Sequence, residues 1–239
     1  MYFDPAYILY VFIPLLAISL VATVLLKAAY AKYSRIPNLQ GITGAEAARL
    51  ILRSAGIYDV DVQPSQGFLS DHYSPREKVL RLSPQNYSGH SIAAVGIAAH
   101  EAGHALQHAG QYAPLVLRNL AVPVANIGST MGYVVIFIGL VLSGGGRGGV
   151  HPIALLGLAL IASIAVFQLL NLPVEFDASR RALHVLPRTG ILTAEEARGA
   201  RSVLAAAAFT YVAATVAAVL ELLYWAWRLG LIGGSSDRD

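Results

Sequence analysis

Residues 100–104 of this chain read HEAGH. Residues four apart lie on one face of a helix, so the imidazoles of His100 and His104 can reach a single metal ion. Glu101 can then reach a water on that ion, as the general base of the H-E-x-x-H zinc signature does. His and Glu each occur seven times in 239 residues, so chance predicts roughly 0.006 such matches. The pattern indicates a catalytic zinc site.

The residues around this motif favour a helix. Positions 91–109 contain many Ala and no Pro, and such a composition supports helix formation. Ser88 or Ser91 is expected to cap the helix start, and Gly110 to end it. A pair of ordinary surface histidines is the simpler interpretation. Apolar residues run up to His100, however, and titratable groups in an apolar helix usually have a function.

The overall composition indicates a membrane protein. Hydrophobic residues make up 56% of the chain, charged residues 13%, and the mean hydropathy is +0.57, which is outside the usual range for a soluble domain. Four largely charge-free runs are long enough to span about 30 Å of hydrocarbon, at about 7–27, 120–143, 152–172 and 204–227. The predicted fold is mostly α: one polytopic membrane domain over 1–239, with a small zincin-like α+β portion that carries the HEAGH helix.

The first run is expected to be a retained anchor, because no Lys or Arg precedes it as in a secretory signal. The distribution of positive charge predicts the topology. Nine Lys and Arg lie in residues 27–118 and five in 180–201, against three elsewhere. Loops rich in Lys and Arg stay in the cytoplasm. Both termini are therefore expected outside the cell, whereas residues 28–118, with the zinc helix, and 174–203 are expected in the cytoplasm. The basic segments lack the interleaved aromatics of nucleic-acid binders, so no nucleic-acid partner is expected.

Several local elements can be predicted outside the spans. Capping boxes at Thr43 with Glu46 and at Thr193 with Glu196 predict two helix starts. Residues 58–62, 67–70 and 78–83 are predicted as strands, the last two joined by a turn at 71–75. An edge strand of this sheet could pair with an extended peptide, or the sheet could be merely structural. Residues 143–149 are predicted as a flexible outer loop.

A catalytic zinc usually has three protein ligands, so a third is needed. His108 is eight residues from His100, about 12 Å along a helix, which is too far for one ion. Glu175 is the best candidate, because the distribution of Lys and Arg places it on the same side of the membrane as the motif. A set of two His and one Glu would be gluzincin-like. A simple interfacial carboxylate paired with Arg180 or Arg181 is the alternative. Asp177 is either a partner that orients a histidine or a salt-bridge partner.

The chain resembles the YugP-type membrane neutral zinc metallopeptidase family. The resemblance rests on five stretches: GFLSDHYSPREKVLRLSPQNY, AAHEAGHALQH, VPVANIGS, NLPVEFDASRRA and GARSVLAAAAFTYVAA. It implies a multi-pass zinc peptidase in a bacterial plasma membrane that acts on peptides or proteins, membrane proteins among them. A more distant similarity to HtpX-like membrane proteases implies a role in membrane-protein quality control. Ser179 replaces the Asp of their E-x-E-A-D-x-x-A frame, so Asp177 is a candidate for that residue's role.

The expected activity is endopeptidase hydrolysis by a zinc-activated water, with Glu101 as the base. A transition-state donor is also expected; the candidates are His72, Asn126, His184 and Tyr211. Two alternatives stay open. The first is a site-2-type intramembrane protease, whose motif Asn171, Pro173 and Asp177 match faintly. In that case Asp177 would be the third zinc ligand. In a non-catalytic zinc scaffold, His108 or His184 would close the site, but such a site needs no base at Glu101.

Overall fold

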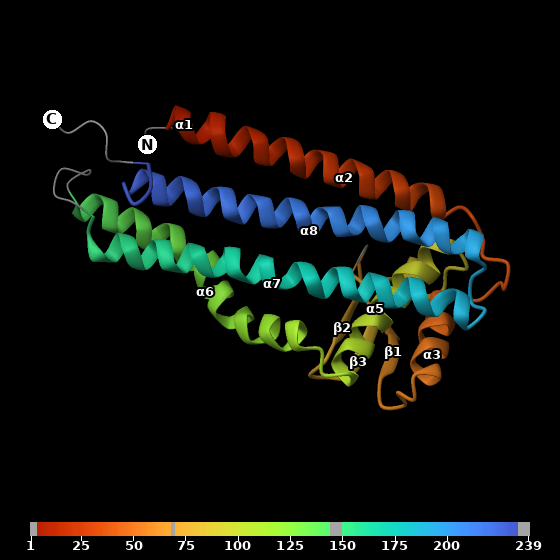
Figure 1. Cartoon of the computed structure of the whole chain (residues 1–239). Coiled ribbons are helices and arrows are strands. Elements are labelled where there is room, and N and C mark those ends of the chain that lie inside the picture. Colours follow the sequence, from red (N-terminus) through yellow and green to blue (C-terminus); the bar gives the residue numbers. More distant parts are fainter. Residues whose placement is uncertain (1–3, 68–69, 144–149, 234–239) are drawn as a thin grey trace. The chain divides into compact units, whose positions relative to one another are not determined.

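The computed structural model describes residues 4–67, 70–143 and 150–233 and is mostly helical, with one small sheet (Figure 1). A first helical stretch runs through α1 (Pro5–Tyr7), η1 (Ile8–Phe12) and α2 (Ile13–Tyr33). The other elements are α3 (Gly44–Ser54), β1 (Asp61–Pro64), β2 (His72–Ser74), β3 (Val79–Leu82), α4 (Pro84–Tyr87), α5 (Ile92–Ala109), α6 (Ala113–Leu142), α7 (Pro152–Arg188) and α8 (Ala194–Arg228).

Four helices are long and apolar enough to cross a membrane: Pro5–Tyr33, Ala113–Leu142, Pro152–Arg188 and Ala194–Arg228. The predicted mostly helical fold with four candidate spans is therefore confirmed. The helices extend beyond the predicted apolar runs, because their polar ends continue the same backbone hydrogen bonding. The predicted outer loop at 143–149 lies, apart from its first residue, outside the described residues.

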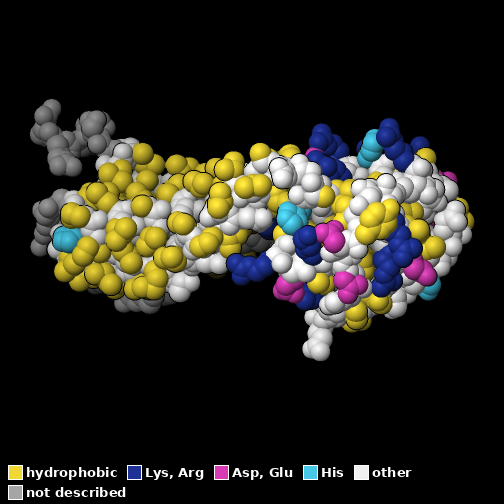
Figure 2. Space-filling model, turned by 90° about the horizontal axis from the view of Figure 1, so that it is seen from below, with side chains coloured by type: hydrophobic (Ala, Val, Ile, Leu, Met, Phe, Trp, Pro, Cys, Tyr) yellow, Lys and Arg dark blue, Asp and Glu magenta, His cyan; other side chains and the backbone are white. Residues whose placement is uncertain are grey.

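The chain divides into two compact units, each assembled from separate parts of the sequence. Residues 1–20, 116–172 and 211–239 form one, here called the membrane unit. Its helices α6 and α7 pack closely at glycines: a Cβ on Gly139 would lie 2.2 Å from the backbone nitrogen of Ala154. Figure 2 shows hydrophobic side chains over the visible face of this unit, whereas Lys, Arg, Asp and Glu gather on the other unit. An apolar outer surface is what a bilayer requires.

Residues 21–115 and 173–210 form the second unit, here called the polar unit. Its core packs α3 against α5 through fully buried side chains, including Ala48, Ile51 and Ala98. The predicted capping box at the start of α3 is present: Glu46 N–H donates to Thr43 Oγ1 over 3.1 Å, and Thr43 N–H donates to Glu46 Oε2 over 2.7 Å. The box predicted at Thr193 forms in the same way before α8.

The sheet has the order β1-β3-β2, with β1 parallel and β2 antiparallel to β3. The predicted turn at 71–75 is wrong, because β2 occupies His72–Ser74 and the turn follows at residues 75–78. Lys78 has a φ of 53° in that turn. Instead of turning the chain, Asp71 accepts a hydrogen bond from Ser83 N–H over 2.8 Å at the start of α4.

The other two strand predictions differ in position. The first strand begins later than predicted, at Asp61 rather than at residue 58. Two of the four residues in the strand predicted at 67–70, positions 68 and 69, lie outside the described residues. Gly67 and Ser70 are described, and neither is in a strand. Ser70 instead bonds to Ser65 through the two hydroxyls, at 2.6 Å.

Candidate metal centre

Helices α5 and α7 bring the predicted zinc ligands together. Helix α5 carries residues 100–104 and is capped by Ser91, whose Oγ accepts from Ala94 N–H over 3.1 Å; Gly110 follows its last residue, as predicted. Helix α7 touches it at Gly103, where an added Cβ would lie only 2.6 Å from the carbonyl oxygen of Ala178. Only glycine permits this approach, which places Glu175 beside the two histidines.

The three predicted ligands form one cluster. Glu175 Oε2 lies 3.3 Å from His100 Nε2 and 3.6 Å from His104 Nε2, and a ligand atom from each residue lies within 4.8 Å of the others. Donors bonded at 2.0–2.1 Å around a tetrahedral ion are separated by about 3.3 Å. The spacing and the two-nitrogen, one-oxygen donor set therefore fit zinc, with a fourth position left for water or substrate.

The second nitrogen of each imidazole also has a partner. His100 Nδ1 lies 3.1 Å from Ser179 Oγ, and His104 Nδ1 lies 3.0 Å from Gln107 Oε1. With a metal ion bound at Nε2, Nδ1 would be the nitrogen that carries the proton and donates it. These bonds fix the orientation of both rings. Ser179 thus makes a direct contact with His100, although it replaces an Asp of the HtpX-like frame.

Gln107 connects the two helices of the site. Its side chain is fully buried, and its amide nitrogen donates to Val174 O over 2.7 Å and to Asp177 Oδ2 over 3.0 Å. Asp177 also accepts from Arg180 and Arg181. Asp177 is therefore a salt-bridge partner that reaches His104 only through Gln107. It is not in the ligand cluster found among the described residues, which disfavours the site-2 arrangement.

Glu101 is buried, with 8% of its surface exposed. Burial raises the pKa of its carboxyl, against the opposite influence of the neighbouring His100 and His104. A carboxylate whose pKa is moved toward neutral is a better proton acceptor at the pH where a peptidase works. The environment of Glu101 therefore suits a general base.

The remaining candidates lie elsewhere. His108 Nδ1 is 2.9 Å from the hydroxyl of Tyr73 on β2, and this contact ties α5 to the sheet. His72 Nδ1 is 2.9 Å from Ser70 O on the surface, and His184 is exposed on α7. Asn126 and Tyr211 belong to the membrane unit. A transition-state role for His72, Asn126, His184 or Tyr211 stays a prediction.

Sequence reasoning missed Gln107, although helical spacing could have found it. Gln107 is three residues after His104, so the two side chains share a helix face. Ser179 stands four residues after Glu175 and could have been placed next to it by the same rule. Gly103 could not have been singled out, because its importance depends on contact with a helix far along the chain.

Comparison with known proteins identifies the family of this chain. Residues 7–230 match the family described as "Putative neutral zinc metallopeptidase". The chain is 42% identical over 217 residues to the "Putative membrane protease YugP" of Bacillus subtilis (strain 168), covering 90% of this chain and 94% of that protein. No solved structure matches the chain. The match over almost the whole length shows that the chain belongs to this neutral zinc metallopeptidase family.

Proposed function

We propose that this protein is a zinc-dependent membrane endopeptidase with His100, His104 and Glu175 as metal ligands and Glu101 as general base. The observation that carries the proposal is the cluster of three candidate ligand atoms within 4.8 Å of one another. In addition, Nδ1 of each imidazole contacts a polar side chain, Ser179 for His100 and Gln107 for His104. A surface pair of histidines would not need oriented rings or a buried carboxylate between them.

The residues of the site divide the chemistry between them. A bound zinc ion would supply a Lewis acid that polarises the peptide carbonyl and makes water acidic enough to ionise near neutral pH. Glu101 accepts the proton from the attacking water and passes it to the leaving amine. Gln107 and Ser179 hold Nδ1 of His104 and His100, so the Nε2 atoms of both rings would be free to hold the ion. A closed structural site would have no use for a buried carboxylate base at Glu101.

The sheet offers a place for the substrate. β2 is an edge strand in the order β1-β3-β2, and Tyr73 on it bonds to His108, one helical turn beyond His104. An extended peptide can add to such an edge through backbone hydrogen bonds, with little dependence on sequence. The substrates proposed are extended or unfolded segments of peptides and membrane proteins, which fits a role in quality control at the cytoplasmic face.

The proposal is tested by Glu101→Gln in the purified full-length protein. The amide cannot accept the proton of water, whereas both histidines remain, so hydrolysis of a quenched peptide should fall at least about 100-fold while bound zinc stays at the wild-type level. Glu195→Gln is the matched control, because Glu195 is exposed at the start of α8. If Glu101→Gln turns over peptide at a near-normal rate, Glu101 is not the base.

A further inference from the structure

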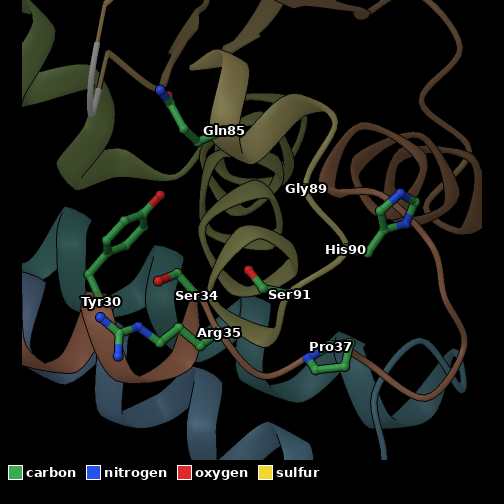
Figure 3. A pocket seen from close by; sticks show the side chains of 8 residues that line it. All are labelled: Tyr30, Ser34, Arg35, Pro37, Gln85, Gly89, His90 and Ser91. Atoms are coloured by element: carbon green, nitrogen blue, oxygen red, sulfur yellow. The ribbon is translucent and has the colours of Figure 1, made fainter.

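A cavity lies in the polar unit beside the N-terminal end of α5, where Ser91 caps the helix. Its volume is about 440 Å³. Figure 3 shows Tyr30 on α2, with Ser34 and Arg35 just after its end, on one wall. The other wall has Gln85 on α4, and Gly89 and Ser91 between α4 and α5. None of its described lining residues belongs to the ligand cluster of the metal centre.

The polar groups of this cavity suit an anion. Among the described residues that line the cavity, Arg35 is the only Lys or Arg, and none is Asp or Glu. Within the described part of the chain, Arg35 has no ion pair or hydrogen bond, so its guanidinium is available to a ligand. Ser34 and Gln85 add neutral polar groups. The His90 ring turns away toward Gly41, whose carbonyl lies 2.8 Å from its Nδ1.

Along α2, the cavity begins at the level of the lipid headgroups, at Tyr30, and extends past that level to Ser34 and Arg35, whose long side chain can reach back toward the headgroups. The charge-free run 7–26 covers about 30 Å at 1.5 Å per residue, which is the thickness of the hydrocarbon core. Tyr30 follows the end of this run by about 6 Å and Ser34 by about 12 Å. The headgroup layer occupies about 5–8 Å on each side of the core. Lys27 and Lys32 lie in the same stretch of chain, which makes it basic.

We propose that this cavity binds the phosphodiester group of an anionic phospholipid from the surrounding bilayer. A guanidinium is well suited to phosphate, with which it forms paired charge-assisted hydrogen bonds. Basic pockets beside membrane helices at the headgroup level are places where anionic lipids bind. The soluble alternative, free inorganic phosphate, has the same chemistry but is not anchored at this depth.

A lipid bound here would stabilise the start of the helix that carries the zinc ligands. Ile92 N–H donates to Ile36 O over 2.9 Å, and Asn38 N–H donates to His90 O over 2.8 Å, so the two walls are already joined at the base of α5. A ligand that bridges the walls adds to this connection. Lipid binding should therefore raise the unfolding temperature whether or not the protein cleaves peptides.

The experiment uses the full-length protein in a non-ionic detergent, with binding and thermal unfolding measured against phosphatidylglycerol, diacylglycerol of the same acyl chains, and inorganic phosphate. Phosphatidylglycerol should bind and raise the melting temperature of the wild type, and diacylglycerol should not. Arg35→Gln should weaken phosphatidylglycerol binding about 10-fold or more, and Arg35→Lys should recover part of it. Arg53→Gln, at an exposed position on α3, should behave as wild type.

Two results would overturn the proposal. Equal binding of phosphatidylglycerol by Arg35→Gln and by the wild type would show that the lipid does not use this cavity. An equal effect of inorganic phosphate alone would assign the cavity to a soluble ligand instead. Glu101→Gln separates this test from the peptidase proposal, because that variant should lose peptide hydrolysis and keep the lipid effect in full.

Discussion

Glu175 and Asp177 are two residues apart on α7, yet they serve different partners. Side chains two apart on a helix point about 200° around the axis from one another, and both of these carboxylates are buried. Glu175 faces His100 and His104, whereas Asp177 is surrounded by Gln107, Arg180 and Arg181. Helix geometry therefore gives these two carboxylates different contact partners.

This separation predicts different results for two substitutions. Glu175→Ala removes a ligand and should sharply reduce the zinc retained after dialysis, together with activity. Asp177→Asn keeps all three ligands but loosens Gln107, so it should weaken zinc binding or activity by about 10–100-fold. Both are measured as zinc stoichiometry and peptide hydrolysis on variants purified in parallel. Full zinc in Glu175→Ala together with its loss in Asp177→Asn would reverse the assignment.

The contact between helices α5 and α7 determines where Glu175 lies. Gly103 lets the two helices touch, and a methyl group there would press on the backbone of Ala178. Metal–ligand distances tolerate only about 0.2 Å of change. A shift of α7 large enough to relieve the clash would therefore move Glu175 out of bonding range.

Gly103→Ala is accordingly expected to weaken zinc affinity about 10-fold or more, although alanine is the better helix former by about 1 kcal/mol. Competition with a chelator gives the affinity, and circular dichroism shows that α-helix is kept. Gly96→Ala is the control on the same helix, because its Cβ would meet the Ala200 side chain on α8 at 3.1 Å rather than α7. Unchanged zinc affinity in Gly103→Ala would mean that this contact does not set the site.

Some elements follow from the sequence and others do not, for physical reasons. The four apolar helices and both capping boxes are encoded locally, within a few residues, and were predicted. The turn at 71–75 was misplaced because Asp71 and Pro75 are typical turn residues; the fold uses Asp71 as an acceptor for Ser83 instead. The grouping of His100, His104 and Glu175 could be predicted from spacing and charge bias, whereas the packing that creates it could not.

At the scale of the whole molecule, the charge distribution predicts how the chain crosses the membrane. Fourteen of the seventeen Lys and Arg lie in residues 27–118 and 180–201. Those segments correspond closely to the polar unit, residues 21–115 and 173–210. Because positive segments stay in the cytoplasm, we predict both termini outside and the metal centre inside.

The natural chain has no Cys, so single cysteines can report this topology. Gly145→Cys, in the stretch outside the described residues, should react with an impermeant thiol reagent added to intact cells. Gln85→Cys should react only after permeabilisation. The reverse pattern, with Gln85→Cys labelled from outside and Gly145→Cys protected, would invert the proposed orientation and place the peptidase site at the outer face.

The wide separation of the ligands along the chain has a consequence for biosynthesis. Glu175 follows His100 by 75 positions in the sequence, and α6 and most of α7 are made in between. A ribosome adds about 5–20 residues per second, so the nascent chain carries the HEAGH helix for several seconds before its third ligand exists. With the proposed ligand set, the metal site is complete only after the third candidate span has been synthesised, so a half-made chain would not cut its neighbours at the translocation machinery.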